Sequence, residues 1–291
     1  MKRQKAWING RFIDIDKAKV SIFDRGFLYG DGAFETMRGY AGIIFRLDEH
    51  LNRFFDSLKV LRIRPPYDKR YLKKALYKSL KINNIKNAYI RLSMTRGEGR
   101  FDIGHKGAFT PNVVVATKEF EEYPAWMYRD GLSAKIVKGI SRNERSILSN
   151  IKSLNFLTFI LARLYAKEAG FDEAILMNAK GHIAEAATSN VFLVKREKLV
   201  TPSLASGILP GITRGVIIEI AKRLKIRVME KLVTRRELLD ADEIFLTNSL
   251  AEVLPVTRVD SSKIASGRVG DLTKLFRISY QKQVIWGRSP K

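Results

Sequence analysis

One lysine stands out because of the residues around it. Lys152 lies in the segment SNIKSLNFL, directly before an apolar run with helical spacing. A lysine at such a position can be partly buried, and burial lowers the pKa of an ammonium group. The neutral amine that results is a nucleophile for Schiff-base chemistry. Taken alone, Lys152 can equally be one of the many solvated surface lysines of this chain.

The segment GILPGITRG, residues 207–215, could bind an anion. Gly211 can adopt backbone conformations closed to other residues, and the chain has helical spacing from about Ile212 onward. The first N–H groups of a helix have no partner within the helix and attract anions, and the hydroxyl group of Thr213 can add a donor. The alternative is an ordinary helix N-cap.

Two further charged residues have positions that suggest chemistry. Glu185 lies in GHIAEAATSNVFLV, between a strand-like segment and four small residues. Its carboxylate could hold a heteroaromatic nitrogen protonated, with room for a ring beside it; the alternative is an acid in a loop. Arg53 follows Glu49 by four residues on a predicted helix face. Arg53 therefore forms either an i,i+4 ion pair or a bidentate bond to a phosphate.

The composition is that of a folded globular protein. The chain has 291 residues, of which 45% are hydrophobic, and no cysteine, which excludes disulfides and thiolate-bound metals. His50, His105 and His182 lack metal-ligand spacing, so we predict no metal site. No apolar run reaches the ~18 residues that span a bilayer. The basic start has no apolar signal-peptide core. We expect a cytoplasmic protein without a membrane partner.

The formal net charge of +23 is unusual. Such a charge suits nucleic acid, an acidic membrane surface or anionic small molecules. The basic residues are nevertheless spread along the chain and interrupted by acidic ones, and a clustered basic face is what a nucleic-acid binder needs. We therefore expect no nucleic-acid partner. A basic nucleic-acid-binding protein without catalysis stays as the alternative from a different functional class.

The elements that must position these residues alternate between strands and helices, which predicts an α+β fold of two domains. We predict a small domain over 1–118, a linker over 119–131 and a large domain over 132–291. Strands are expected within 5–16, 41–50, 87–97, 112–120, 132–139, 173–178, 190–196, 226–233 and 243–249. Helices are expected within 48–63, 68–84, 153–170, 212–226 and 235–241.

Six segments together resemble the class IV aminotransferases, the fold-type IV enzymes that use pyridoxal 5'-phosphate (PLP). They are DRGFLYGDGAFETMRGY, FRLDEHLNR, IKSLNFL, IAEAATSNVFLV, ILPGITRGVIIEIA and FLTNSLAEVLPV. They cover the chain from Ile22 to about Asp260 in the order of that family. The resemblance implies a small N-terminal α/β sandwich domain, a larger C-terminal pseudo-barrel α/β domain, and a homodimer with each site near the interface.

The resemblance also implies roles for single residues. Lys152 would be the Schiff-base lysine and later the base that moves the substrate's α-proton, while Glu185 would pair with the pyridine nitrogen. The phosphate would be held by Arg53, Ile212 and Thr213, with Ser249 adding a hydroxyl group. Leu209 would pack on the ring face, and Gly211 would provide the turn. Asn248 and Leu250 would shape the turn beside the phosphate and the substrate carboxylate.

The substrate side resembles the branched-chain enzymes of the family in most of its features. Tyr29, Phe34 and Tyr89 would form an aromatic wall for an aliphatic side chain, and Arg91 also matches that type. D-amino-acid transaminases usually carry a tyrosine at the position of Phe34.

Other features match the D-amino-acid enzymes and the lyases as well. The segment KSLNF is common to them, and Phe156 replaces a tyrosine of many branched-chain enzymes. Arg96 and Arg100 lie in a loop that, by resemblance, reaches toward substrate carboxylates; the alternative for both is surface charge.

The function that the resemblance implies is transfer of an amino group from a small, branched-chain L-amino acid to 2-oxoglutarate. The amino-acid and 2-oxo-acid substrates would react by a ping-pong Schiff-base mechanism on PLP. A D-amino-acid transaminase and a 4-amino-4-deoxychorismate lyase are the alternatives within the family.

Overall fold

The chain divides into two compact units. A computed structural model describes residues 4–99, 103–104 and 109–286. The first unit contains the described residues up to Glu121 together with Ile151–Asn155, and the second contains the rest. The segment that carries Lys152 thus packs in the first unit, whereas the predicted large domain runs from residue 132 without interruption.

The first unit is built on a six-stranded antiparallel sheet with the strand order β2-β1-β6-β5-β3-β4. Its strands are β1 (Lys5–Ile8), β2 (Arg11–Asp14), β3 (Gly32–Tyr40), β4 (Ile43–Ile44), β5 (Ala88–Thr95) and β6 (Val113–Glu119). Its helices are α1 (Arg25–Tyr29), α2 (Leu47–Val60) and α3 (Lys69–Asn83).

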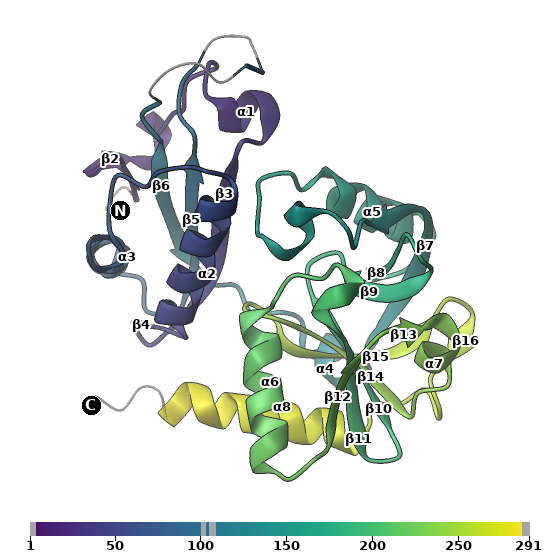
Figure 1. Cartoon of the computed structure of the whole chain (residues 1–291). Helices are drawn as coiled ribbons and strands as arrows, with labels where there is room; N and C mark the ends of the chain where they lie inside the picture. Colours follow the sequence, from purple (N-terminus) through teal and green to yellow (C-terminus); the bar gives the residue numbers. More distant parts are fainter. Residues whose placement is uncertain (1–3, 100–102, 105–108, 287–291) are drawn as a thin grey trace. The chain divides into compact units, whose positions relative to one another are not determined.

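Helices α2 and α3 pack their apolar sides on one face of this sheet (Figure 1). In β5 every second residue is buried, as expected for a strand with one face toward the core. Leu51, Phe54 and Leu58 of α2 fill the space between helix and sheet. The helical spacing seen in the sequence therefore identified the core face of α2.

The sequence pattern did not reveal β3 as a strand, although it lies between β5 and β4. Almost all of its residues are buried, so the alternation that marks a half-exposed strand is missing. Its segment GAFETMRGY also contains two buried charged residues, Glu35 and Arg38. Partners supplied by the tertiary structure make this burial possible, and a local pattern does not contain them.

The second unit is built on a mixed sheet of ten strands that comes close to a barrel. Its order is β12-β11-β10-β14-β15-β7-β8-β9-β13, and β16 pairs with β15. The strands are β7 (Leu132–Arg142), β8 (Glu173–Asn178), β9 (His182–Ala186), β10 (Asn190–Lys195), β11 (Lys198–Pro202), β12 (Val228–Lys231), β13 (Val233–Thr234), β14 (Glu243–Asn248), β15 (Glu252–Val259) and β16 (Ser262–Lys263). The helices are α4 (Ala125–Arg129), α5 (Leu157–Glu168), α6 (Ile212–Arg223), α7 (Arg235–Leu239) and α8 (Asp271–Trp286).

Aromatic packing fastens α8 to this sheet. The rings of Phe192 and Phe245 stack with centroids 5.0 Å apart, and Phe276 of α8 packs on Phe245 at 5.6 Å. Glu243 of β14 accepts hydrogen bonds from the backbone N–H groups of Leu272 and Thr273, at 3.1 and 2.7 Å, and so caps the start of α8. In Figure 1, α6 crosses α8 on this side of the sheet.

Several predicted elements differ from the structure, and the strands expected within 5–16 and 226–233 are each divided into two. The helix expected over 153–170 begins only at Leu157, because the preceding residues pair with β3. The strand expected within 41–50 is reduced to the two residues of β4, since α2 already begins at Leu47. The predicted linker contains the short helix α4. Among the helices of the described residues, none has the length and apolar character required to cross a bilayer.

Candidate active site

The backbone of Lys152 is held between β3 and α2 in the first unit. The N–H group of Phe34 donates to the carbonyl oxygen of Lys152 at 3.0 Å, and that of Leu154 donates to the carbonyl of Gly32 at 2.9 Å. The N–H group of Lys152 lies 3.3 Å from the Ser57 hydroxyl oxygen, its acceptor. This segment is therefore a short addition to the edge of β3, not the start of a helix.

The side chain of Lys152 lies over an aromatic ring. Its Nζ atom is 4.6 Å from the centroid of Phe34, and the guanidinium carbon of Arg91 is 3.8 Å from the same centroid. Phe34 is 4% exposed and Lys152 is half-buried. Tyr89 lies two residues before Arg91 in β5 and so on the same sheet face. The structure thus brings Lys152, Phe34 and Arg91 together, with Tyr89 on the same face.

Tyr29 belongs to a different element from the rest of the predicted aromatic wall. It is the last residue of α1, and its ring lies 5.0 Å from the guanidinium carbon of Arg25 in the same helix. The side chain is 38% exposed. A wall that joins Tyr29 to Phe34 and Tyr89 stays a prediction.

A buried ion pair fixes Arg53. Its Nε and Nη2 atoms donate to the two carboxylate oxygens of Glu35, at 2.7 and 2.8 Å, and Nδ1 of His50 lies 2.7 Å from the second oxygen. The i,i+4 ion pair with Glu49 that the spacing suggested is wrong, because Glu49 pairs with Arg46 at 2.7 Å. Burial makes Glu35 the stronger partner for Arg53.

The charges in this cluster follow from its surroundings. Burial by itself raises the pKa of Glu35, but Arg53 and then His50 outweigh it and lower that pKa to about 2. Burial lowers the pKa of His50, and its attraction to Glu35 opposes this only in part. At neutral pH Glu35 is ionised and His50 is neutral. Since a carboxylate only accepts hydrogen bonds, Nδ1 of His50 carries the hydrogen.

In the second unit, Glu185 is part of strand β9 and not of a loop. Its side chain is nearly fully buried. One carboxylate oxygen accepts the N–H group of Leu209 at 3.0 Å, and the other lies 3.0 Å from Nε of Arg142. Sequence reasoning missed Arg142, which ends strand β7 far from Glu185 in the chain. A buried carboxylate needs a cationic partner, and this requirement was the available signal.

The turn that precedes α6 is held by side chains from other strands. Nε of Arg142 donates to the carbonyl of Gly207 at 3.1 Å, and Nδ2 of Asn190 donates to that of Leu209 at 2.9 Å. Gly207, with φ of 80°, supplies the left-handed conformation. Gly211 has an ordinary φ of −68°, so the expected conformational role is wrong. A Cβ atom there would overlap Oδ1 of Asn190, so a larger residue would force a local shift.

Helix α6 begins at Ile212, which confirms the start predicted from the sequence. Gly211 is the N-cap residue and its helix has no side-chain cap, while Thr213 lies within the first turn with its side chain buried. The N-terminal N–H groups and a threonine hydroxyl are the donor set that suits a phosphate group. This donor set fits the phosphate of PLP.

Asn248 shapes the turn after β14. Its Oδ1 atom accepts the N–H groups of Leu250 and Ala251 at 2.9 and 2.7 Å, and its Nδ2 atom donates to the Ser189 hydroxyl oxygen at 2.9 Å. Ser249 lies half-buried in this turn, as does Leu250. The side chain of Asn248 is thus a structural part of the turn that carries the predicted contact residues.

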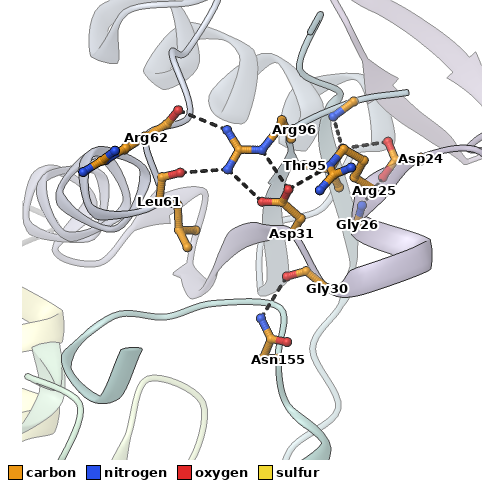
Figure 2. Close-up of polar contacts among 11 residues, drawn as sticks. Asp24, Arg25, Gly26, Gly30, Asp31, Leu61, Arg62, Thr95, Arg96 and Asn155 are labelled. Carbon is orange, nitrogen blue, oxygen red and sulfur yellow. Dashed lines mark hydrogen bonds and ion pairs between the residues drawn. The ribbon is translucent and has the colours of Figure 1, made fainter. Parts of the chain in front are cut away.

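The two loop arginines have different outcomes. Arg100 lies outside the described residues. Arg96, expected to reach toward substrate carboxylates or to lie on the surface, does neither. Its Nε and Nη2 atoms donate to the carboxylate of Asp31, at 2.7 and 3.0 Å, as Figure 2 shows. With a side chain only 11% exposed, Arg96 is an internal structural residue.

Comparison with known proteins identifies the family. Residues 32–259 match the family model "Amino-transferase class IV". The chain is 39% identical over 285 residues to a putative branched-chain-amino-acid aminotransferase of Methanocaldococcus jannaschii, covering 97% of this chain and 98% of that protein. It is 34% identical to a D-alanine aminotransferase of Bacillus licheniformis, covering 97% of each.

A solved structure agrees with this result. The branched-chain amino acid aminotransferase of Thermobaculum terrenum in its PLP form has a TM-score of 0.88 and 29% identity, covering 99% of this chain and 95% of that one. The family and the fold agree with the residues described above, which include a lysine amine, a buried carboxylate and a helix start without a side-chain cap. The chain belongs to the class IV aminotransferases and is a PLP-dependent enzyme.

Proposed function

We propose that this aminotransferase moves the amino group of a branched-chain L-amino acid to 2-oxoglutarate. The observation that carries the proposal is the buried apolar ring of Phe34, whose centroid lies 3.8 Å from the guanidinium carbon of Arg91 and 4.6 Å from Nζ of Lys152. A phenyl ring has no hydroxyl group to bind a carboxylate. It favours an aliphatic side chain, which gains ~0.8 kcal/mol per buried methylene. The name of the Methanocaldococcus jannaschii relative supports the same substrate class.

The proposed chemistry divides between the cofactor and three residues of the chain. Bound PLP supplies an aldehyde that condenses with amines and a ring that withdraws electrons from the substrate's α carbon. Lys152 would provide the amine that holds the cofactor and then the base that takes the substrate's α-proton. Glu185 would accept a hydrogen bond from the protonated ring nitrogen. Arg142 orients Glu185 through the ion pair at 3.0 Å.

The remaining site residues are proposed to bind and orient. The first N–H groups of α6, at Ile212 and Thr213, would hold the phosphate together with the hydroxyl groups of Thr213 and Ser249. Arg53 would add a positive charge. Its guanidinium group is already oriented by Glu35, so its position is fixed before an anion arrives. Leu209 would pack on the ring face.

Discrimination between donors tests the substrate class. The purified enzyme with 2-oxoglutarate is offered L-leucine, L-valine, D-alanine and 4-amino-4-deoxychorismate, and glutamate formation is measured. We expect kcat/KM to be highest for L-leucine and L-valine. Preference for D-alanine would instead favour the D-amino-acid transaminase that the Bacillus licheniformis relative represents. Pyruvate release from the last donor without glutamate formation would favour the lyase.

We further propose that the enzyme is a cytoplasmic homodimer. Helix α5 exposes a row of large apolar side chains in the second unit: Leu157, Ile160, Leu161, Leu164 and Tyr165. Such a row on one short helix is typical of an interface between subunits. Sedimentation of Leu164→Glu should show monomers at concentrations where the parent chain is dimeric. Lys167→Glu, an exposed change on the same helix, should leave the dimer intact.

A further inference from the structure

Arg96 uses all three nitrogen atoms of its guanidinium group within the first unit. Besides the two bonds to Asp31, Nη1 donates to the carbonyl of Arg62 at 3.1 Å and Nη2 donates to that of Leu61 at 2.8 Å. Figure 2 shows the guanidinium group enclosed by these partners. A planar guanidinium group that donates hydrogen bonds on several sides is held rigidly, and a lysine ammonium group cannot make the same set of bonds.

These bonds join the ends of three elements. Leu61 and Arg62 directly follow α2, Arg96 directly follows β5, and Asp31 directly precedes β3. The backbone N–H group of Arg96 also donates to the carbonyl of Asp31 at 3.0 Å. The last carbonyls of a helix lack partners within the helix, so a guanidinium group there satisfies acceptors that are otherwise left over.

A second arginine, Arg25, also pairs with Asp31. Nε of Arg25 lies 3.0 Å from the carboxylate, and the Arg25 side chain is almost fully buried. Burial raises the pKa of Asp31, but the hydrogen bonds from Arg96 and Arg25 outweigh it and lower that pKa. Asp31 is therefore ionised at neutral pH and binds both arginines as a carboxylate.

The two neighbours of Asp31 hold the segment 151–155. The carbonyl of Gly30 accepts Nδ2 of Asn155 at 3.1 Å, also drawn in Figure 2, and the carbonyl of Gly32 accepts the N–H group of Leu154 at 2.9 Å. Since Asp31 fixes the backbone between these two carbonyls, its ion pairs set the place where the segment attaches to β3.

The other support of Lys152 is tied to Arg96 as well. The N–H group of Lys152 donates to the hydroxyl oxygen of Ser57 on α2, and the end of α2 is the helix end that Arg96 binds. Both elements that carry the backbone of Lys152 are thus joined by one guanidinium group.

We propose that the ion pair of Asp31 and Arg96 is a positioning device for the Lys152 amine. It acts through the start of β3 and the end of α2, without touching cofactor or substrate. The proposal rests on the proposed role of Lys152 in the reaction. Arg96 therefore has a structural role in positioning Lys152, which its place in a loop of the sequence does not suggest.

Hydrogen exchange of backbone amides tests this directly in the full chain freed of PLP. In Asp31→Asn the amides of Phe34 and Leu154, which bond across to the Lys152 segment, should exchange about tenfold faster or more, because a charged hydrogen bond is lost. Arg96→Lys keeps the positive charge but loses the planar guanidinium group and most of its hydrogen bonds. The exchange rates of the same two amides should increase in this variant, but less than in Asp31→Asn. Unchanged exchange in both variants would overturn the proposal.

A matched control separates positioning from general loss of stability. Asn83 in the same unit donates to the carbonyl of Lys5 at 2.8 Å and to the Thr117 hydroxyl oxygen at 2.9 Å, away from the segment. Asn83→Ala should lower the stability of the unit and leave the exchange of Phe34 and Leu154 as in the parent chain. Equal acceleration in Asn83→Ala and Asp31→Asn would overturn the positioning role.

Cofactor attachment gives a second readout. Borohydride fixes PLP to the amine that holds it, and peptide mass spectrometry locates that amine. We expect Asp31→Asn to attach PLP at Lys152 at least about tenfold more slowly than the parent chain or Asn83→Ala. A parent chain that attaches no PLP at Lys152 would overturn the proposed function, whereas the exchange comparison decides the positioning role independently.

Discussion

Nε of Arg142 lies 3.0 Å from a carboxylate oxygen of Glu185 and also donates to the carbonyl of Gly207 at 3.1 Å. The other oxygen of Glu185 accepts the N–H group of Leu209. One ion pair therefore links a buried acid to the turn that precedes α6. The acid proposed for the ring nitrogen and the residue proposed for the ring face are positioned together, because they share a hydrogen bond.

Replacing Arg142 should weaken cofactor binding. Arg142→Met removes the charge beside Glu185 and the donor to Gly207, and hydrogen bonds to charged groups are worth about 1.5–3 kcal/mol. We expect the Kd for PLP to rise about tenfold or more, measured by titration of the PLP-free enzyme. Arg145→Met, an exposed change three residues further along, is the control. A Kd for Arg142→Met within twofold of the parent value would contradict the proposed role.

Lys152→Ala should remove both covalent attachment of PLP and turnover. The backbone of Lys152 is held in place by a hydrogen bond from the N–H group of Phe34 and one to the hydroxyl oxygen of Ser57. We expect no other lysine to replace its amine, because none of the other described lysines is held at this position. Borohydride trapping and glutamate formation are measured side by side, with Lys180→Ala on the exposed surface as the control. Trapped cofactor on another peptide, with activity retained, would show that Lys152 is not the lysine that holds PLP.

Periodic patterns predicted helices α2, α3, α5, α6 and α7, and they missed helix α8 and strand β3. Helix α2 was predictable because its apolar residues recur with helical spacing on one buried face. Strand β3 was not, since it is buried on both faces and contains Glu35, whose partners His50 and Arg53 come from α2. A charged residue becomes compatible with a central strand only when the tertiary structure supplies its partners.

The same distinction applies to the candidate site. The start of α6 at Ile212 was predictable, because glycine and proline followed by apolar spacing are local signals. Arg142 and Glu35 were not predicted, because the role of each depends on an ion pair with a residue of another element, Glu185 and Arg53 respectively. Arg96 was placed near substrate by resemblance of its loop, and the backbone carbonyls it binds belong to the end of α2.

Gly211→Ala should weaken phosphate binding without straining the backbone. Its φ of −68° suits any residue, but the new Cβ atom would overlap Oδ1 of Asn190, so either that side chain, which binds the carbonyl of Leu209, or the start of α6 must shift. We expect the Kd for PLP to rise about tenfold or more, equivalent to a loss of ~1.4 kcal/mol. Adding Asn190→Ala should recover part of this loss, because the overlapping atom is then gone.

Gly215→Ala in the same helix is the control for that experiment. A Cβ atom at Gly215 meets no atom within 4 Å. Alanine favours the helix over glycine by about 1 kcal/mol, so this variant should be more stable than the parent chain with an unchanged Kd for PLP. Equal Kd values for Gly211→Ala and Gly215→Ala would show that crowding by Asn190 does not control the phosphate site.

The first unit should lose stability in acid in two steps, one from protonation of His50 and one from protonation of Glu35, which lie in the same buried cluster. Because the pKa of His50 is lowered on folding, the unfolded chain takes up this proton first, and stability falls as the pH drops below 6.5. The pKa of Glu35 falls from 4.5 to about 2, so its contribution is complete above 4.5 and is lost between 4.5 and 2. That contribution is about 3 kcal/mol, from 1.36 kcal/mol per pKa unit.

The variant His50→Asn separates the two steps, because its amide can still donate to Glu35 and does not titrate. Urea unfolding is followed by the fluorescence of Trp7, buried in the same unit, with Trp126 and Trp286 replaced by phenylalanine. The difference in free energy of unfolding between parent and variant should be constant above pH 6.5. Below that pH the parent chain should lose stability faster, while both lose the Glu35 contribution below 4.5. A pH-independent difference would mean that folding leaves the pKa of His50 unchanged, which would contradict the lowered pKa.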